Sequence, residues 1–158
     1  MKKNDSENHD FRKKALSLSD LFFELEGRRP RVLVGTFQNN AGTVLNTIAN
    51  SLSDTGFDVD ISPFITSGQS VCMNALENDV DVLLMLIDSS EFKDHILELE
   101  SSLSHHSADF LLLYICNNCR SRYLQKEESS DRIILELNEK RSEIGHLIMK
   151  LLLHETGS

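Results

Sequence analysis

The sequence lacks the features that mark secreted, membrane-spanning and nucleic-acid-binding proteins. Three cysteines in 158 residues are too few for a disulfide scaffold, and they fit a reducing cytoplasm. The longest apolar runs, such as residues 80–87, are far shorter than a membrane span, and the polar N-terminus has no secretory signal. A net charge of −9 argues against binding to nucleic acid or to anionic lipid. The composition therefore predicts a cytoplasmic, acidic protein.

Motifs of the common catalytic sites are missing as well. The sequence contains no glycine-rich phosphate loop, no nucleophile elbow and no H-E-x-x-H segment. A chain of 158 residues is long enough to bury the core of one domain, and its 40% hydrophobic and 26% charged residues are ordinary for a globular protein. The sequence thus predicts one globular domain without a familiar catalytic motif.

The N-terminal region divides into two parts of different character. Residues 1–14 are almost wholly polar, which predicts a flexible tail. Residues 15–27 are rich in leucine and phenylalanine and predict a short amphipathic helix, which Gly27 ends. Apolar side chains between Leu16 and Leu25 would be a liability if they stayed exposed, so we expect this chain or a partner to cover them.

The region from residue 28 to residue 155 alternates between short apolar runs and segments of helical periodicity. Strands are predicted over 32–34, 57–61, 80–87 and 110–115, and helices over 43–54, 67–78, 91–103 and 142–154. Residues 132–137 suit either a fifth strand or a helix. Continuous apolar runs are typical of parallel strands buried on both faces. The pattern predicts an α/β fold with a flavodoxin-like open parallel five-stranded sheet and helices on both faces.

Three segments of the chain carry a resemblance to a known family. They are Gly27-Arg-Arg-Pro-Arg-Val-Leu-Val34, Gly56-Phe-Asp-Val-Asp-Ile-Ser-Pro63 and Glu77-Asn-Asp-Val80. Through these segments the chain resembles the cobalamin-binding domain of methylmalonyl-CoA mutase, from Gly27 to about Leu103. The resemblance implies a cobalamin-binding-like α/β domain over residues 28–155.

The cofactor motifs of that family are absent from this chain. Family members carry Asp-x-His-x-x-Gly after the first strand, and the histidine is the lower axial ligand of cobalt. This chain has Gln38-Asn-Asn-Ala-Gly42 there, and only Gly42 matches. The family's Ser-x-Leu corresponds to Leu86-Ile-Asp88, and its Gly-Gly pair corresponds to Ile115-Cys116. Bulky side chains at these places would fill the space for the nucleotide tail, so we expect no cofactor and keep cobalamin as the alternative.

Polar residues at the predicted carboxyl ends of the strands define a candidate crevice. Its members are Thr36, Gln38, Asn39, Asn40, Gly42, Asp88, Ser89 and Cys116. Neutral amides cannot replace an imidazole as a cobalt ligand. Response-regulator receivers share this fold, and Asp88 is placed like their central aspartate. However, residues 32–36 offer no acidic pair, which argues against a receiver.

The segment Cys116-Asn-Asn-Cys119 is formally a redox motif or half of a zinc site. Nearby Arg120 and Arg122 suit a thiolate, whereas a zinc site needs two further ligands. We interpret the pair as structural and keep redox activity and metal binding as alternatives.

Three functional hypotheses follow. The first is a non-catalytic, degenerate cobalamin-binding-like domain that acts as a subunit or protein-interaction module related to methylmalonyl-CoA mutase. Its partner would be a mutase-type subunit or a second copy of the chain. The resemblance implies that the barrel domain holding the substrate is missing, so we do not expect an enzyme. The second hypothesis is a detached cobalamin-binding subunit of a coenzyme-dependent isomerase, and the third is a small-molecule sensor with a rebuilt crevice.

Overall fold

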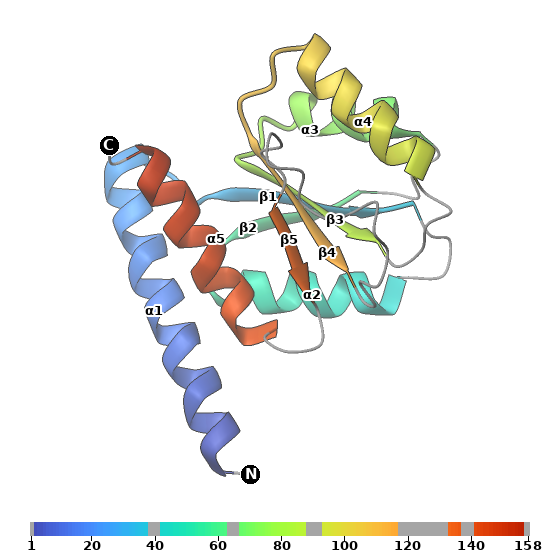
Figure 1. Ribbon diagram of the computed structural model, residues 1–158. Coiled ribbons are helices and arrows are strands. Elements are labelled where there is room, and N and C mark those ends of the chain that lie inside the picture. Colours follow the sequence, from blue (N-terminus) through green and yellow to red (C-terminus); the bar gives the residue numbers. More distant parts are fainter. Residues whose placement is uncertain are drawn as a thin grey trace.

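A parallel sheet between two layers of helices forms the protein (Figure 1). The computed structural model describes residues 2–37, 42–62, 67–87, 93–116, 133–136 and 141–156. Its elements are α1 (Lys2–Glu26), β1 (Arg31–Thr36), α2 (Gly42–Asp54), β2 (Asp58–Ile61), α3 (Gly68–Glu77), β3 (Val82–Ile87), α4 (Lys93–His105), β4 (Leu111–Cys116), β5 (Ile133–Glu136) and α5 (Arg141–Thr156). The predicted α/β fold with a parallel sheet is confirmed.

The strands lie in the order β2-β1-β3-β4-β5, and each neighbouring pair is parallel. Leu33 of β1 lies between Asp60 of β2 and Leu83 of β3. The strand order reverses between β1 and β3. At such a switch point, open α/β sheets bind their ligands outside the carboxyl ends of the strands.

Two apolar layers cover the two faces of the sheet, and β3 contributes to both. One layer joins Val82, Leu84 and Leu86 to α1, α2 and α5. The other joins Leu83, Met85 and Ile87 to α3 and α4. Every side chain of β3 is buried. Burial on both faces explains the continuous apolar run from which this strand was predicted.

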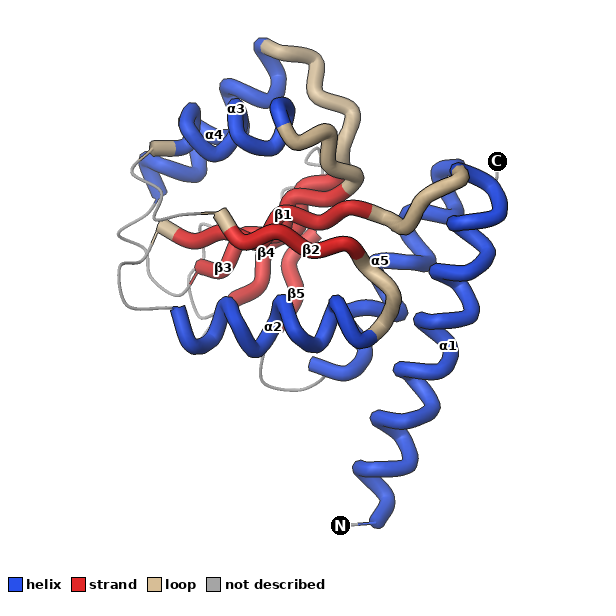
Figure 2. The backbone as a smooth tube through the Cα atoms, turned by 180° about the vertical axis from the view of Figure 1, so that it is seen from behind, coloured by secondary structure: helices blue, strands red, loops and turns tan. Residues whose placement is uncertain are grey.

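Helix α1 begins at Lys2 and has 25 residues, so it includes most of the segment 1–14 that was predicted as a flexible tail. It lies along α5 on the outer side of the molecule (Figure 2). The ring of Phe11 lies 5.9 Å from the His146 ring of α5, and Lys14 pairs with Asp10 at 3.1 Å. No helical periodicity marks the sequence here because Phe11 is a single apolar residue in a polar segment, yet it continues the packing face of α1.

Helix α1 is fixed to the turn that follows α2. The buried Ser19 hydroxyl donates a 2.6 Å hydrogen bond to the carbonyl oxygen of Gly56 and accepts one of 3.0 Å from Arg29. Gly56 has a φ of +93°, and a Cβ there would lie 2.7 Å from the Cβ of Ser19. This glycine follows the end of α2 and lets α1 approach closely.

Asp81 joins two strands at the amino edge of the sheet. Its carboxylate accepts hydrogen bonds of 2.6 and 2.8 Å from the guanidinium of Arg28 and one of 2.8 Å from the backbone N–H of Arg31. The hydrogen bond from Arg28 to Asp81, opposed by burial, raises the pKa of Arg28. Because Arg31 begins β1 and Asp81 precedes β3, this network sets the start of both strands.

Most other element bounds lie within a few residues of their predictions. The helix predicted over 67–78 is α3, where the hydroxyl of Ser67 accepts a hydrogen bond from the N–H of Ser70 as an N-cap. Within 132–137, β5 pairs with β4 so that Ile133 lies beside Leu113. No helix in the described ranges is both long and apolar enough to cross a bilayer.

Candidate functional site

The carboxyl ends of three strands meet at one edge of the sheet. Strand β1 ends at Thr36, β3 at Ile87 and β4 at Cys116. Thr36 lies beside Leu86 in the register, and Ile87 lies beside Cys116. The loops from which a crevice was predicted therefore leave the sheet from neighbouring points.

Most of the predicted crevice residues lie outside the described part of the chain. These are Gln38, Asn39, Asn40, Asp88 and Ser89. Cys119 also lies outside it, as does the side chain of Cys116. The redox and zinc alternatives for the cysteine pair thus stay predictions.

Thr36 reaches the edge, but its hydroxyl is engaged within the sheet. The side chain is buried, and its Oγ1 donates a 3.1 Å hydrogen bond to the carbonyl oxygen of Leu86. This bond ties the end of β1 to the end of β3. Thr36 therefore stabilises the rim of the expected crevice.

Gly42 is the first residue of α2, and it is exposed. A Cβ added there would meet no described atom within 4 Å. The space around Gly42 therefore does not require glycine. Gly42 aligns with the motif glycine of the family, but no described residue is close enough to exclude a larger side chain at this position.

An aromatic pair beside the rim was missed in the sequence. The ring of Phe37, directly after β1, stacks on the ring of His95 in α4 with centroids 4.9 Å apart and planes 22° apart. Phe37 is buried in the same layer as Leu33, four residues earlier along β1. The alternation of β1 could have indicated this burial, whereas His95 has no local pattern that distinguishes it.

The strand ends are filled by branched side chains. Leu86 and Ile115 stand where the family resemblance calls for serine and glycine, and both are buried in the layer beneath α2 and α5. His95 of α4 brings an imidazole near the end of β1.

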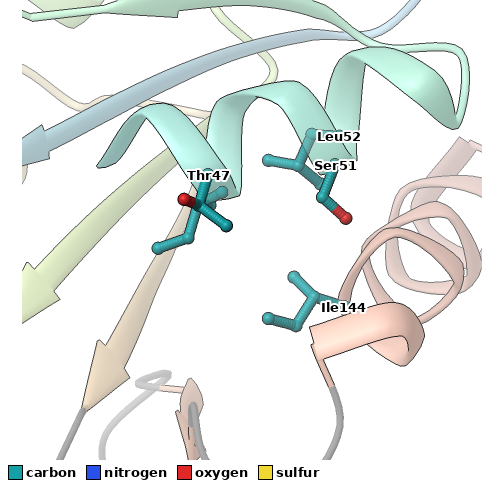
Figure 3. Close-up of a pocket in the computed structure, with 5 residues that line it drawn as sticks. Thr47, Ser51, Leu52 and Ile144 are labelled. Carbon is teal, nitrogen blue, oxygen red and sulfur yellow. The ribbon is translucent and has the colours of Figure 1, made fainter. Parts of the chain in front are cut away.

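A small apolar pocket opens between α2 and α5 (Figure 3). Thr47, Ser51 and Leu52 of α2 face Ile144 of α5 across it. Its volume is about 120 Å³, whereas pockets for small organic ligands usually measure about 300–1,000 Å³. Because it is smaller than these, the pocket has room only for a small apolar group.

The described residues provide no clear nucleophile or metal centre. Cys72 is a free cysteine buried in the layer beneath α3 and α4, and burial raises the pKa of its thiol. Such a thiol stays protonated and unreactive at neutral pH. No group of three or more His, Cys, Asp or Glu side chains in the described ranges could hold a metal ion.

Part of the chain is similar in sequence to methylmalonyl-CoA mutase. The large subunit from Streptomyces virginiae is 40% identical over 68 residues, which cover 42% of this chain and 9% of that protein. The Escherichia coli K12 mutase is 38% identical over 66 residues, covering 41% and 9%. The mitochondrial mutase of Bos taurus is 33% identical over 91 residues, covering 57% and 12%. The matches span about a tenth of the length of these relatives, and no protein-family model matches the chain.

Two solved structures share the fold at low sequence identity. A fusion of the trimeric coiled coil of yeast Spc42 to another structure gives a TM-score of 0.60 at 16% identity, covering 81% of this chain and 82% of that one. The N-terminal domain of a response regulator/sensory box/GGDEF protein from Carboxydothermus hydrogenoformans gives 0.56 at 16% identity, covering 80% and 96%. These similarities support the α/β fold alone. The sequence matches add that a segment of the chain is related to methylmalonyl-CoA mutase.

Proposed function

We propose that this chain is a non-catalytic, degenerate cobalamin-binding-like domain that acts through protein contact, as a subunit or interaction module related to methylmalonyl-CoA mutase. The observation that carries the proposal is the burial of Leu86 and Ile115 at the positions where the resemblance calls for serine and glycine. The sequence similarity to mutases supports the relationship. The packing at the strand ends supports loss of the cofactor.

Cobalamin binding would cost free energy at the packed strand ends. Forcing extra volume into a packed interior usually costs about 1–3 kcal/mol. A nucleotide tail at the strand ends would have to displace Leu86 and Ile115, which also pack with Ile48 and Leu52 of α2. In addition, the sequence has no histidine at the motif position to form the cobalt bond. Both effects oppose cobalamin binding.

We further propose a flavodoxin-like five-stranded domain over residues 28–155, working in the cytoplasm. The strand order, with β5 beside β4, supports this architecture. The free, buried thiol of Cys72 suits a reducing compartment. A mutase-type subunit or a second copy is the partner that this proposal favours.

Titration with cobalamin tests the proposal. Hydroxocobalamin and adenosylcobalamin are added to the purified chain, and their absorbance spectra are followed. We expect no saturable spectral change, because the motif position has no histidine and the side chains of Leu86 and Ile115 are buried at the strand ends. A dissociation constant below about 10 μM, roughly −7 kcal/mol, would contradict the proposal.

One observation favours the alternative of a detached cobalamin-binding subunit of an isomerase. His95 brings an imidazole within 4.9 Å of the ring of Phe37, at the end of β1. If cobalamin binds, the variant His95→Ala shows whether this imidazole is the ligand. Loss of the spectral change in this variant, with binding retained in His105→Ala, would support the alternative.

The sensor hypothesis concerns the crevice at the strand ends, and the pocket between α2 and α5 is a separate place where a small ligand could bind. This pocket adjoins the hydroxyl-bearing residues Thr47 and Ser51. A thermal-shift screen tests it, since a ligand at a hundred times its dissociation constant adds about 2.7 kcal/mol to stability. If no small molecule raises the melting temperature, protein contact remains the better-supported function.

A further inference from the structure

Large exposed apolar side chains are concentrated on α1. Among the described residues, Leu16, Leu21, Phe23 and Leu25 of this helix are exposed, while only Ile61, Met73 and Leu97 are exposed elsewhere. Figure 1 and Figure 2 both show α1 as the outermost helix, beside α5. Its outer side is therefore open to another molecule.

A single stripe of four exposed residues runs along this outer side. Lys13, Ser17, Leu21 and Glu24 follow the spacing i, i+4, i+8 and i+11, so they share one face of the helix. Leu25 adjoins the stripe and is 57% exposed. Ser17 donates its hydroxyl to the carbonyl oxygen of Lys13 at 3.1 Å, so it needs no outside hydrogen-bond partner.

The stripe is complementary to itself when it is read in reverse. In an antiparallel pair of α1 helices centred near Leu18 and related by a two-fold axis, Lys13 lies opposite Glu24 of the second copy. In this register Ser17 lies opposite position 20 of the second copy, and Leu21 lies one residue further along on the same face. The small side chain of Ser17 therefore leaves room for the large side chain of Leu21. Residues on the same flank of the helix meet across such an axis, and Lys13 and Glu24 share a flank. Each contact occurs twice because the interface is isologous.

A parallel pairing of the same faces is disfavoured. It would set Lys13 against Lys13 and Glu24 against Glu24, and like charges that face each other oppose association. It would also set the two Leu21 side chains against each other and leave a gap at Ser17. Charge and size therefore select the antiparallel arrangement.

We propose that this outer face of α1, with Ser17 and Leu21 in its middle, Lys13 and Glu24 at its ends and Leu25 beside it, binds a second copy of the chain as an antiparallel, two-fold helix pair. The proposal deepens the proposed protein-contact function and rests on it, because it names the contacting surface and its partner.

Sedimentation of the purified full chain tests the pairing at about 100 μM, a concentration that populates any dimer with a micromolar dissociation constant. We expect twice the 17.9 kDa mass of one chain. Lys13→Glu and Glu24→Lys should each weaken the dimer about tenfold or more, because each creates two like-charge contacts. The double variant should restore the affinity, because the pair is reversed and still opposite in sign.

A matched pair of leucine variants separates this face from others. Leu21→Glu should give a monomer, whereas Leu97→Glu, at a 50% exposed leucine of α4, should leave the dimer unchanged. Far-ultraviolet circular dichroism confirms that each variant is folded. A monomeric native chain, a dimer that dissociates with Leu97→Glu but not with Leu21→Glu, or a double charge reversal that fails to restore affinity would each overturn the proposal.

The sedimentation result is distinct from the cobalamin titration. A dimer that binds cobalamin would support this interface while contradicting the non-catalytic, cofactor-free function. A monomer that binds no cobalamin would contradict the interface while leaving that function in place.

Discussion

At the scale of single residues, Asp81 shows how one carboxylate organises the amino edge of the sheet. Its oxygens accept three hydrogen bonds, two from the Arg28 side chain and one from the backbone of Arg31. The Asp81 side chain is 17% exposed, so water competes only partly for these bonds. Hydrogen bonds to a partly buried charge are stronger than those at an open surface.

We predict that Asp81→Asn lowers the free energy of unfolding by about 1–3 kcal/mol. The amide removes the charge that pairs with Arg28 and replaces one acceptor oxygen with a donor. Urea unfolding followed by circular dichroism measures the change. The neighbouring Asp79→Asn is the control: Asp79 is 88% exposed, and its oxygen lies 3.7 Å from Arg31. Equal losses in the two variants would contradict a special role for Asp81.

At the scale of elements, α1 has one buried and one exposed phenylalanine in succession. Phe22 is 2% exposed and Phe23 is 48% exposed. Each ring has an arginine near its face, Arg28 at 5.7 Å and Arg29 at 5.2 Å. The two positions therefore share their aromatic chemistry and cation contact but differ in burial.

We predict that Phe22→Ala destabilises the protein by about 3–5 kcal/mol, because it leaves a cavity under α1. Phe23→Ala should cost about 1 kcal/mol or less, since it removes an exposed ring and its cation contact. Thermal or urea unfolding of both variants provides the measurement. Similar losses of unfolding free energy in the two variants would show that α1 does not pack on the protein through the face that carries Phe22.

The elements also show where sequence reasoning works. Buried β3 and α3 were predicted because each carries a local signal, a continuous apolar run in one and helical periodicity in the other. The first half of α1 was not predicted as a helix because its polar segment has one apolar residue, Phe11, whose contact His146 is far away in the sequence. The Phe37–His95 stack was missed for the same reason. Local patterns predict elements, whereas contacts between distant residues need the fold.

At the scale of the whole molecule, burial decreases from the middle of the sheet to its β2 edge. Strand β3 pairs with β1 and β4 and is buried throughout, whereas β2 pairs only with β1. Two of the four residues of β2, Asp58 and Asp60, carry exposed carboxylates. Charged side chains on an edge strand discourage pairing with other sheets. The same charges leave β2 with little apolar contact.

We therefore predict that backbone amides of β3 exchange with solvent deuterium at least about tenfold more slowly than those of β2, a difference of about 1.4 kcal/mol in opening free energy. Amides of β3 should open only when the whole sheet unfolds, because both core layers depend on this strand. Amides of β2 should open locally. Exchange detected by mass spectrometry, corrected for intrinsic rates, measures this ratio.

In the variant Asp81→Asn, the amides of β3 should exchange faster in proportion to the lost global stability, while the exchange of β2 changes less. Equal protection of β2 and β3 in the native chain would contradict this prediction, because it would mean that the β2 edge of the sheet opens only together with its centre.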